Sequence, residues 1–279
     1  MARSRNPLTN ALWYFVVFII IQVFASFLGG IAWFMAEGQS FTSAAASLQN
    51  GVLNTKPMAL ITITGITSII VILLFALLKW SPFSHRYIRT RPWLAMIWVA
   101  LLACGSIIPS AWLMEIFEFE MNSDIEEALT NIMGRPVGYI VVGILAPLGE
   151  EMVFRGAILR TLLRAFNERW AWIAIAISAM AFGAVHGNMP QFFHATLMGL
   201  LLGWMYLKTD SIFPGVVFHW INNSIAFVLA NVFPQSQNEK LVDLFGGNQQ
   251  MVWYALGFSL CIFLPSLYQL AKRLHKADN

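Results

Sequence analysis

Residues 136–163 read PVGYIVVGILAPLGEEMVFRGAILRTLL, a long apolar stretch that carries two adjacent carboxylates, Glu150 and Glu151. About 20 apolar residues suffice to cross a bilayer. An ionisable side chain inside such a segment is costly and by default indicates a functional site. We therefore expect the other helices of the chain to hold polar groups around these two acids.

The composition agrees with a membrane protein. The chain of 279 residues is 58% hydrophobic and 11% charged, with a mean hydropathy of +0.66, whereas soluble domains are about 25% charged. Because irregular backbone cannot face lipid, the expected fold is all-α and polytopic, with residues 1–279 forming one transmembrane domain. The expected partner is the lipid bilayer, and no nucleic acid is expected. Cys104 and Cys261 lie in apolar segments without disulfide or metal-ligand spacing.

Apolar segments predict about eight transmembrane helices. Their approximate ranges are 12–34, 58–78, 93–114, 136–163, 170–186, 191–207, 212–232 and 251–271. The first follows Arg3 and Arg5 but is too long for a signal peptide and lacks a clear cleavage site, so we expect a retained anchor. Residues 115–135 are predicted to be an acidic extracytoplasmic loop or an amphipathic helix. This stretch contains Glu118, Glu120, Asp124, Glu126 and Glu127, and Asn122-Ser123-Asp124 is typical of a helix start.

The basic residues predict the orientation. Cytoplasmic loops carry an excess of Lys and Arg. With the N-terminus inside, the outer side receives only Lys56, Arg135 and Lys240. The inner side receives the other fourteen: Arg3, Arg5, Lys79, Arg86, Arg89, Arg91, Arg155, Arg160, Arg164, Arg169, Lys208, Lys272, Arg273 and Lys276. We therefore expect a multi-pass protein with both termini in the cytoplasm. One half-helix or re-entrant segment remains compatible with this count.

Helical spacing separates the two glutamates. Glu151 and Arg155 are four residues apart with the acid first, which is the favourable order for an ion pair. Glu150 is about 140° round the helix from Arg155 and lacks that partner. We expect Glu151 to be anchored and Glu150 to point into an intramembrane polar cavity, where it suits a general base acting on water. The alternative is a buried ion network that only fixes helix packing.

Three further segments carry polar side chains. His219 and Asn223 share a helix face, so they can present two donors to a developing oxyanion, or they can serve as polar contacts between helices. Asn222 is expected to point elsewhere. Phe182 and His186 are also four apart, which places a ring beside the imidazole. His194 is expected to be interfacial, near the outer surface.

Counting residues along the helices raises one difficulty. At 1.5 Å per residue, Glu150 and His219 lie toward the cytoplasmic half, whereas His186 falls near the outer surface. Either the fifth helix is strongly tilted, or it starts deeper and residues 187–190 form a break within the membrane.

The three motifs together resemble a known family. EExxxR at Glu150–Arg155, FxxxH at Phe182–His186 and HxxxN at His219–Asn223 occur in this order on successive apolar segments. The combination is similar to the CPBP family of CAAX proteases and bacteriocin-processing enzymes, also called Abi, which includes the type II CAAX prenyl endopeptidase. The resemblance covers roughly residues 145–226, within a predicted catalytic helix core of residues 136–232.

The resemblance implies an intramembrane protease whose cavity opens toward the cytoplasm. It implies that Glu150 activates water with assistance from His186, that His219 and Asn223 stabilise the oxyanion, and that Glu151 and Arg155, with Phe182, support them. The family is also labelled metalloprotease. Glu150, His186 and His219 could hold Zn²⁺, although no HExxH is present. The cofactor is therefore left open, with a slight preference for the metal-free route.

The expected function is an endopeptidase that cleaves a membrane-associated or lipidated peptide or protein. The alternatives are a non-enzymatic bacteriocin-immunity or scaffold protein, and a proton-coupled transporter. The compact size suggests a prokaryotic cell membrane, where prenylated CAAX proteins are not expected as substrates. The sequence sets neither the substrate nor the oligomeric state.

Overall fold

The computed structural model describes residues 6–117, 122–166, 168–233 and 240–277, and within them all regular structure is helical. Arg3, Arg5, Glu118 and Glu120 lie outside the described residues. The elements are α1 (Pro7–Ala36), α2 (Phe41–Gln49), η1 (Val52–Thr55), α3 (Pro57–Leu77), α4 (His85–Arg89), α5 (Trp93–Ile116), α6 (Ser123–Met133), α7 (Pro136–Tyr139), η2 (Ile140–Leu145), α8 (Ala146–Glu151), η3 (Met152–Leu159), α9 (Arg160–Ala165), η4 (Glu168–Trp170), α10 (Ala171–Ala184), α11 (Met189–Thr209), α12 (Phe213–Val232), α13 (Leu241–Leu244) and α14 (Gln249–Arg273).

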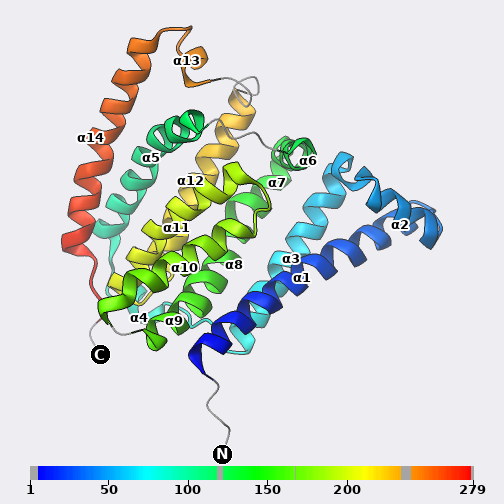
Figure 1. Cartoon of the computed structure of the whole chain (residues 1–279), viewed down its shortest axis with the longest axis horizontal. Helices are drawn as coiled ribbons and strands as arrows, with labels where there is room; N and C mark the ends of the chain where they lie inside the picture. The colour runs from blue at the N-terminus through cyan, green and yellow to red at the C-terminus, as the bar shows by residue number, and fades with distance from the viewer. Residues whose placement is uncertain (1–5, 118–121, 167, 234–239, 278–279) are drawn as a thin grey trace, which may run out of the picture.

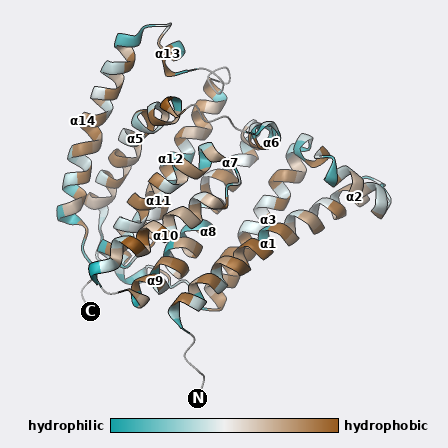
Figure 2. Cartoon of the chain, viewed as in Figure 1, coloured by the Kyte–Doolittle hydropathy of each residue, from teal (hydrophilic) through white to brown (hydrophobic). Residues whose placement is uncertain are grey.

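Six helices in the described part of the chain are long and apolar enough to cross a membrane. They are Pro7–Ala36, Pro57–Leu77, Trp93–Ile116, Pro136–Ala165, Phe213–Val232 and Gln249–Arg273. Figure 2 shows apolar residues along these helices and hydrophilic residues concentrated at helix ends and in α6. Large apolar side chains on α1, such as Leu12 and Phe24, are 62% and 60% exposed. Because lipid tails are as apolar as these side chains, such exposure suits a helix that faces the bilayer. The predicted all-α polytopic fold is confirmed.

The fifth predicted helix is shorter than expected. α10 has 14 residues, or about 21 Å, which is less than the roughly 30 Å of a bilayer core. It ends before Gly187, whose φ of +72° is a left-handed conformation that favours glycine. Asn188 then caps α11 by accepting a hydrogen bond from the backbone N–H of Gln191 at 2.9 Å. α10 and α11 thus form a hairpin whose turn spans residues 185–188, next to the break expected at residues 187–190.

The hairpin packs closely because small residues line its contact. A Cβ atom on Gly199 would lie 2.8 Å from Ala179 Cβ, and one on Gly203 would lie 2.8 Å from Ile175 Cγ2. Side chains at these positions would therefore push α10 and α11 apart. The GxxxG spacing on α11 serves the close backbone approach that is typical of membrane helices.

The helix that carries the glutamates is irregular. Between Pro136 and Ala165 the chain alternates between α-helix and two π-helical segments, η2 and η3, which flank α8. Pro147 in α8 lacks a backbone N–H, and proline cannot complete a regular helical ladder. π-Helical turns within helices are rare and often occur at functional sites. Glu150 and Glu151 lie between the two irregular segments.

The ends of the bundle differ in which segments they contain. Figure 1 shows the start of α1 and the end of α14 toward the same end of the molecule as α4 and α9, whereas α6 and α13 lie toward the opposite end. The predicted helix in the acidic stretch is present as α6. It begins as predicted, with the side chain of Asn122 accepting a hydrogen bond from the backbone N–H of Asp124 at 2.9 Å.

Candidate active site

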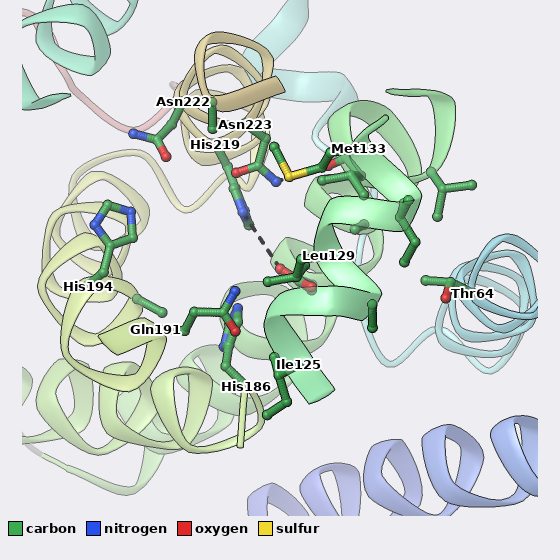
Figure 3. A pocket seen from close by; sticks show the side chains of 18 of the residues that line it. Thr64, Ile125, Leu129, Met133, His186, Gln191, His194, His219, Asn222 and Asn223 are labelled. Carbon is green, nitrogen blue, oxygen red and sulfur yellow. Dashed lines mark hydrogen bonds and ion pairs between the residues drawn. The ribbon is translucent and has the colours of Figure 1, made fainter. Parts of the chain in front are cut away.

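A cavity of about 530 Å³ lies among α6, α8 and the helices α10 to α12. Its polar lining includes Glu150, His186, His219 and Asn223, so the structure brings together all four residues predicted to be catalytic. Figure 3 shows the side chains of His186, His219 and Asn223 around one space, facing Ile125 and Leu129 of α6. His186 follows α10 in the turn before α11, and it lines the same cavity as Glu150.

The two glutamates differ in environment as their spacing predicted. Glu151 is fully buried, and its Oε1 accepts a hydrogen bond from Arg155 Nη1 at 2.7 Å. The predicted ion pair is therefore confirmed. The side chain of Glu150 is 22% exposed and lines the cavity. Arg155 compensates the charge of Glu151 through this hydrogen-bonded ion pair. Glu150 is therefore the carboxylate that remains available to a ligand in the cavity.

His219 connects the two acids. Its Nε2 lies 3.7 Å from Glu150 Oε2, and its Nδ1 lies 3.5 Å from Glu151 Oε1. The imidazole is almost fully buried. α12 can approach this closely because Gly215 has no side chain, since a Cβ there would lie 2.6 Å from Glu151 Oε2. The sequence did not predict this contact between His219 and both acids.

Phe182 is the apolar centre of the site. Its ring is fully buried and meets His186 edge-on at 5.2 Å and His219 edge-on at 5.7 Å between centroids. The guanidinium carbon of Arg155 lies 4.5 Å from the centroid of the same ring, a favourable cation–π distance. Phe182 thus fixes the position of both imidazoles relative to the Glu151–Arg155 pair.

The hydrogen bond of His186 assigns its proton. Nδ1 lies 2.9 Å from the carbonyl oxygen of Phe182. A carbonyl oxygen only accepts, so Nδ1 carries the hydrogen and Nε2 of the neutral ring is an acceptor. His186 can therefore accept a hydrogen bond from a water molecule in the cavity.

Asn222 and His194, which were not expected in the site, line the same cavity as Asn223. Asn223 Nδ2 donates to the carbonyl oxygen of Val142 at 2.9 Å, which leaves one amide hydrogen for another acceptor. Asn222, expected to point elsewhere, is buried and lines the same cavity. His194, expected to be interfacial, also lines it, and its Nδ1 lies 2.6 Å from Ser110 Oγ. The position of Asn222 could have been inferred from its spacing of three from His219, because residues three apart are neighbours on a helix.

The alternative zinc site does not fit the side chains present. Within the described ranges, no three His, Cys, Asp or Glu side chains converge as metal ligands. Glu150, His186 and His219 share the cavity without forming such a group. The metalloprotease label is therefore not supported, and we derive no step through a metal ion.

The fold and the cavity define an all-α, multi-pass membrane protein with a buried carboxylate–histidine site. Residues 133–225 match the family model described as "Type II CAAX prenyl endopeptidase Rce1-like". This range contains all three motifs, so the resemblance predicted from them is confirmed.

Two curated bacterial proteins are also similar to the chain. "Membrane-embedded CAAX protease MroQ" of Staphylococcus aureus (strain USA300) is 27% identical over 152 residues, which are 52% of this chain and 60% of that protein. "Putative membrane peptidase YdiL" of Bacillus subtilis (strain 168) is 26% identical over 115 residues, which are 41% of this chain and 46% of that protein. The chain thus matches about half the length of these relatives. No solved structure matches it significantly.

Proposed function

We propose that this protein is an intramembrane endopeptidase that hydrolyses a peptide bond in a membrane-associated or lipidated peptide with a glutamate-activated water. The observation that carries the proposal is the division of the glutamates. Arg155 holds Glu151 at 2.7 Å, whereas Glu150 lies in the cavity beside His219. The family match and the names of the two relatives support a membrane protease.

In the proposed reaction, Glu150 takes a proton from a water molecule while the water oxygen attacks the carbonyl carbon of the substrate. His186 orients this water through Nε2, because its Nδ1 hydrogen is engaged by the Phe182 carbonyl. The new C–O bond converts the carbonyl oxygen into an oxyanion. The C–N bond then breaks, and the proton held by Glu150 passes to the departing amine, so that the carboxylate is regenerated.

His219 and Asn223 are the proposed donors to the oxyanion. Asn223 keeps one amide hydrogen after its bond to the Val142 carbonyl, and that bond fixes the orientation of the amide. His219 is held between the two acids and against Phe182. Donors that are preorganised in a site of low dielectric stabilise developing charge without further reorganisation.

The test is Glu150→Gln in the full chain, reconstituted in lipid and assayed against membrane peptides from the host. Because the amide cannot accept the proton, we expect turnover to fall by about 10²- to 10⁴-fold. Substrates are identified by comparing peptides cleaved in cells with wild type and with the variant. Glu127→Gln is the matched control, since Glu127 is exposed on α6 and does not line the cavity. Undiminished hydrolysis by Glu150→Gln would exclude the mechanism.

A further inference from the structure

A second cavity, of about 450 Å³, lies at the end of the bundle that holds α9 and the end of α14 (Figure 1). Side chains of α9, η4, the start of α10, the end of α11 and the segment after α14 line it. Its charged lining residues, which define it here as the basic cavity, are Arg160, Arg164, Glu168, Asp210 and Lys276. It shares no described lining residue with the candidate active site.

The cations of the basic cavity are not neutralised by the protein. Arg160 and Arg164 are four residues apart on α9, so they share a helix face on which two like charges repel each other. Within the described ranges, no ion pair involves either arginine or Lys276. Three cations and the two acids Glu168 and Asp210 give the lining a net charge of +1. A monoanion between the arginines would relieve their repulsion and neutralise the lining.

Tyr206 adds a neutral hydrogen-bond donor to the same lining. Its side chain is 3% exposed, and in the described part of the chain its hydroxyl finds no hydrogen-bond partner. Arg160, Arg164 and Asp210 are close enough to interact with it electrostatically. Because a buried donor without a partner is costly, the hydroxyl suits a ligand oxygen. A phosphate group can accept from Tyr206 with one oxygen and bind the guanidiniums with the others.

An apolar groove of about 310 Å³ adjoins the basic cavity. It is lined by Trp172, Leu200, Leu201, Trp204 and Leu267. Trp172 directly follows Ala171 of the basic cavity, and Trp204 precedes Leu207 of that cavity by three residues, or about 4.5 Å along α11. The groove thus extends from the charged end of α11 toward the middle of that helix. A free phosphate ion makes no use of such a groove, whereas the acyl chain of a phospholipid gains by entering it.

Aromatic side chains mark the level of the lipid headgroups beside the basic cavity. Trp170 and Trp172, at the start of α10, are 48% and 57% exposed. The guanidinium carbon of Arg169 lies 5.4 Å from the centroid of the Trp170 ring, and Lys272 Nζ lies 4.3 Å from that of Tyr268. Trp and Tyr are enriched where a membrane meets water. Basic pockets between membrane helices are suited to anionic headgroups at this level.

We propose that the basic cavity and the apolar groove together bind one phospholipid with a single negative charge, of the phosphatidylglycerol type. Its phosphate lies between Arg160 and Arg164 and accepts a hydrogen bond from Tyr206. One acyl chain lies in the groove against Trp172 and Trp204. The lipid joins α9, the α10–α11 hairpin and the segment after α14. The site is independent of the proposed peptidase chemistry, because it uses none of the residues assigned to that reaction.

The test measures lipid binding to the full chain by native mass spectrometry. Wild type in detergent is titrated with dioleoyl phosphatidylglycerol or dioleoyl phosphatidylethanolamine, and we expect the anionic lipid to bind about tenfold more tightly. Arg160→Gln combined with Arg164→Gln should weaken its binding by about 30-fold. Tyr206→Phe, which removes only the hydroxyl, should weaken it by about 3- to 10-fold. The matched control is Arg86→Gln combined with Arg89→Gln, on exposed α4 positions outside the cavity, and it should leave binding unchanged.

Crosslinking to wild type separates a lipid from a free phosphate and needs no variant. A phosphatidylglycerol with a photoreactive acyl chain should form adducts at the residues of the groove. An excess of inorganic phosphate or of the deacylated headgroup should not displace it. Displacement by either would show a site for a free anion and overturn the proposal. Equal binding of the two lipids, equal losses in the α4 control, or adducts spread evenly over the exposed face of α1 would also overturn it.

Discussion

Adjacent residues of identical chemistry take different environments in this site. Arg155 is one helical turn after Glu151 and is fully buried with it, so that each charge has its partner. Glu150 is displaced round the helix and meets the cavity instead. Such a pair is expected to separate a structural role from a chemical one. Substitutions at Glu151 should therefore mainly lower stability, whereas substitutions at Glu150 should mainly lower hydrolysis.

Loss of the Glu151 carboxylate should lower stability first. Glu151→Ala leaves the Arg155 guanidinium buried without a counter-charge, which typically costs about 3–5 kcal/mol, so we expect a clearly lower melting temperature in detergent. Glu37→Gln is the control, because the Glu37–Lys56 ion pair is exposed, and it should leave melting unchanged. Equal melting of Glu151→Ala and wild type would show that the buried pair does not hold the fold together.

Local spacing was enough to predict part of the site. Four residues between Glu151 and Arg155, or between Phe182 and His186, indicate a shared face whatever the tertiary structure. The positions of His194 and Asn222 depend instead on how α11 and α12 pack around the cavity, which the local pattern does not contain. The contacts of His219 with both acids also depend on Gly215, whose role becomes visible only when α12 meets α8.

At the scale of elements, the α10–α11 hairpin decides whether the site assembles. The sequence predicted a helix over residues 170–186 followed by a turn, and α10 ends two residues earlier, at Ala184. The stop is set by the left-handed φ of Gly187 and by the Asn188 cap. His186 lies in the turn after α10 and lines the cavity. The Gly-Asn-Met-Pro run signals this turn in the sequence, but the local pattern does not contain what His186 faces.

Close packing of this hairpin is expected to be essential. In Gly199→Ala the added Cβ would lie 2.8 Å from Ala179 Cβ and 2.9 Å from its Cα. Because backbone cannot yield as a flexible side chain does, we expect a loss of about 1–3 kcal/mol in stability. Hydrolysis should also be reduced, because α10 carries Phe182 and leads directly into the turn that holds His186. The control is Gly257→Ala in α14, where a Cβ would meet no atom within 4 Å. Similar melting temperatures for the two variants would contradict this account.

At the scale of the whole molecule, two expectations from the sequence point to opposite ends of the bundle. The basic residues predict that α4 and α9 face the cytoplasm, together with both termini. The family resemblance implies that the cavity opens to the cytoplasm. The cavity lining, however, includes Asn54 of η1 and Asp124 of α6, and α6 lies toward the end opposite α4 and α9 (Figure 1). The orientation predicted from the basic residues and the cytoplasmic opening implied by the resemblance are therefore in conflict.

Thiol labelling decides between them. Single cysteines replace the exposed Arg86 of α4 and the exposed Lys240 beside α13, in a background where Cys104 and Cys261 are serine. In intact cells we expect an impermeant maleimide to label position 240 and not position 86, because basic loops are retained inside. Both should react after permeabilisation, which controls for accessibility. With that result, the α6 end of the cavity faces the outer side of the membrane. Labelling of position 86 alone would reverse the orientation and place the α6 end of the cavity on the cytoplasmic side.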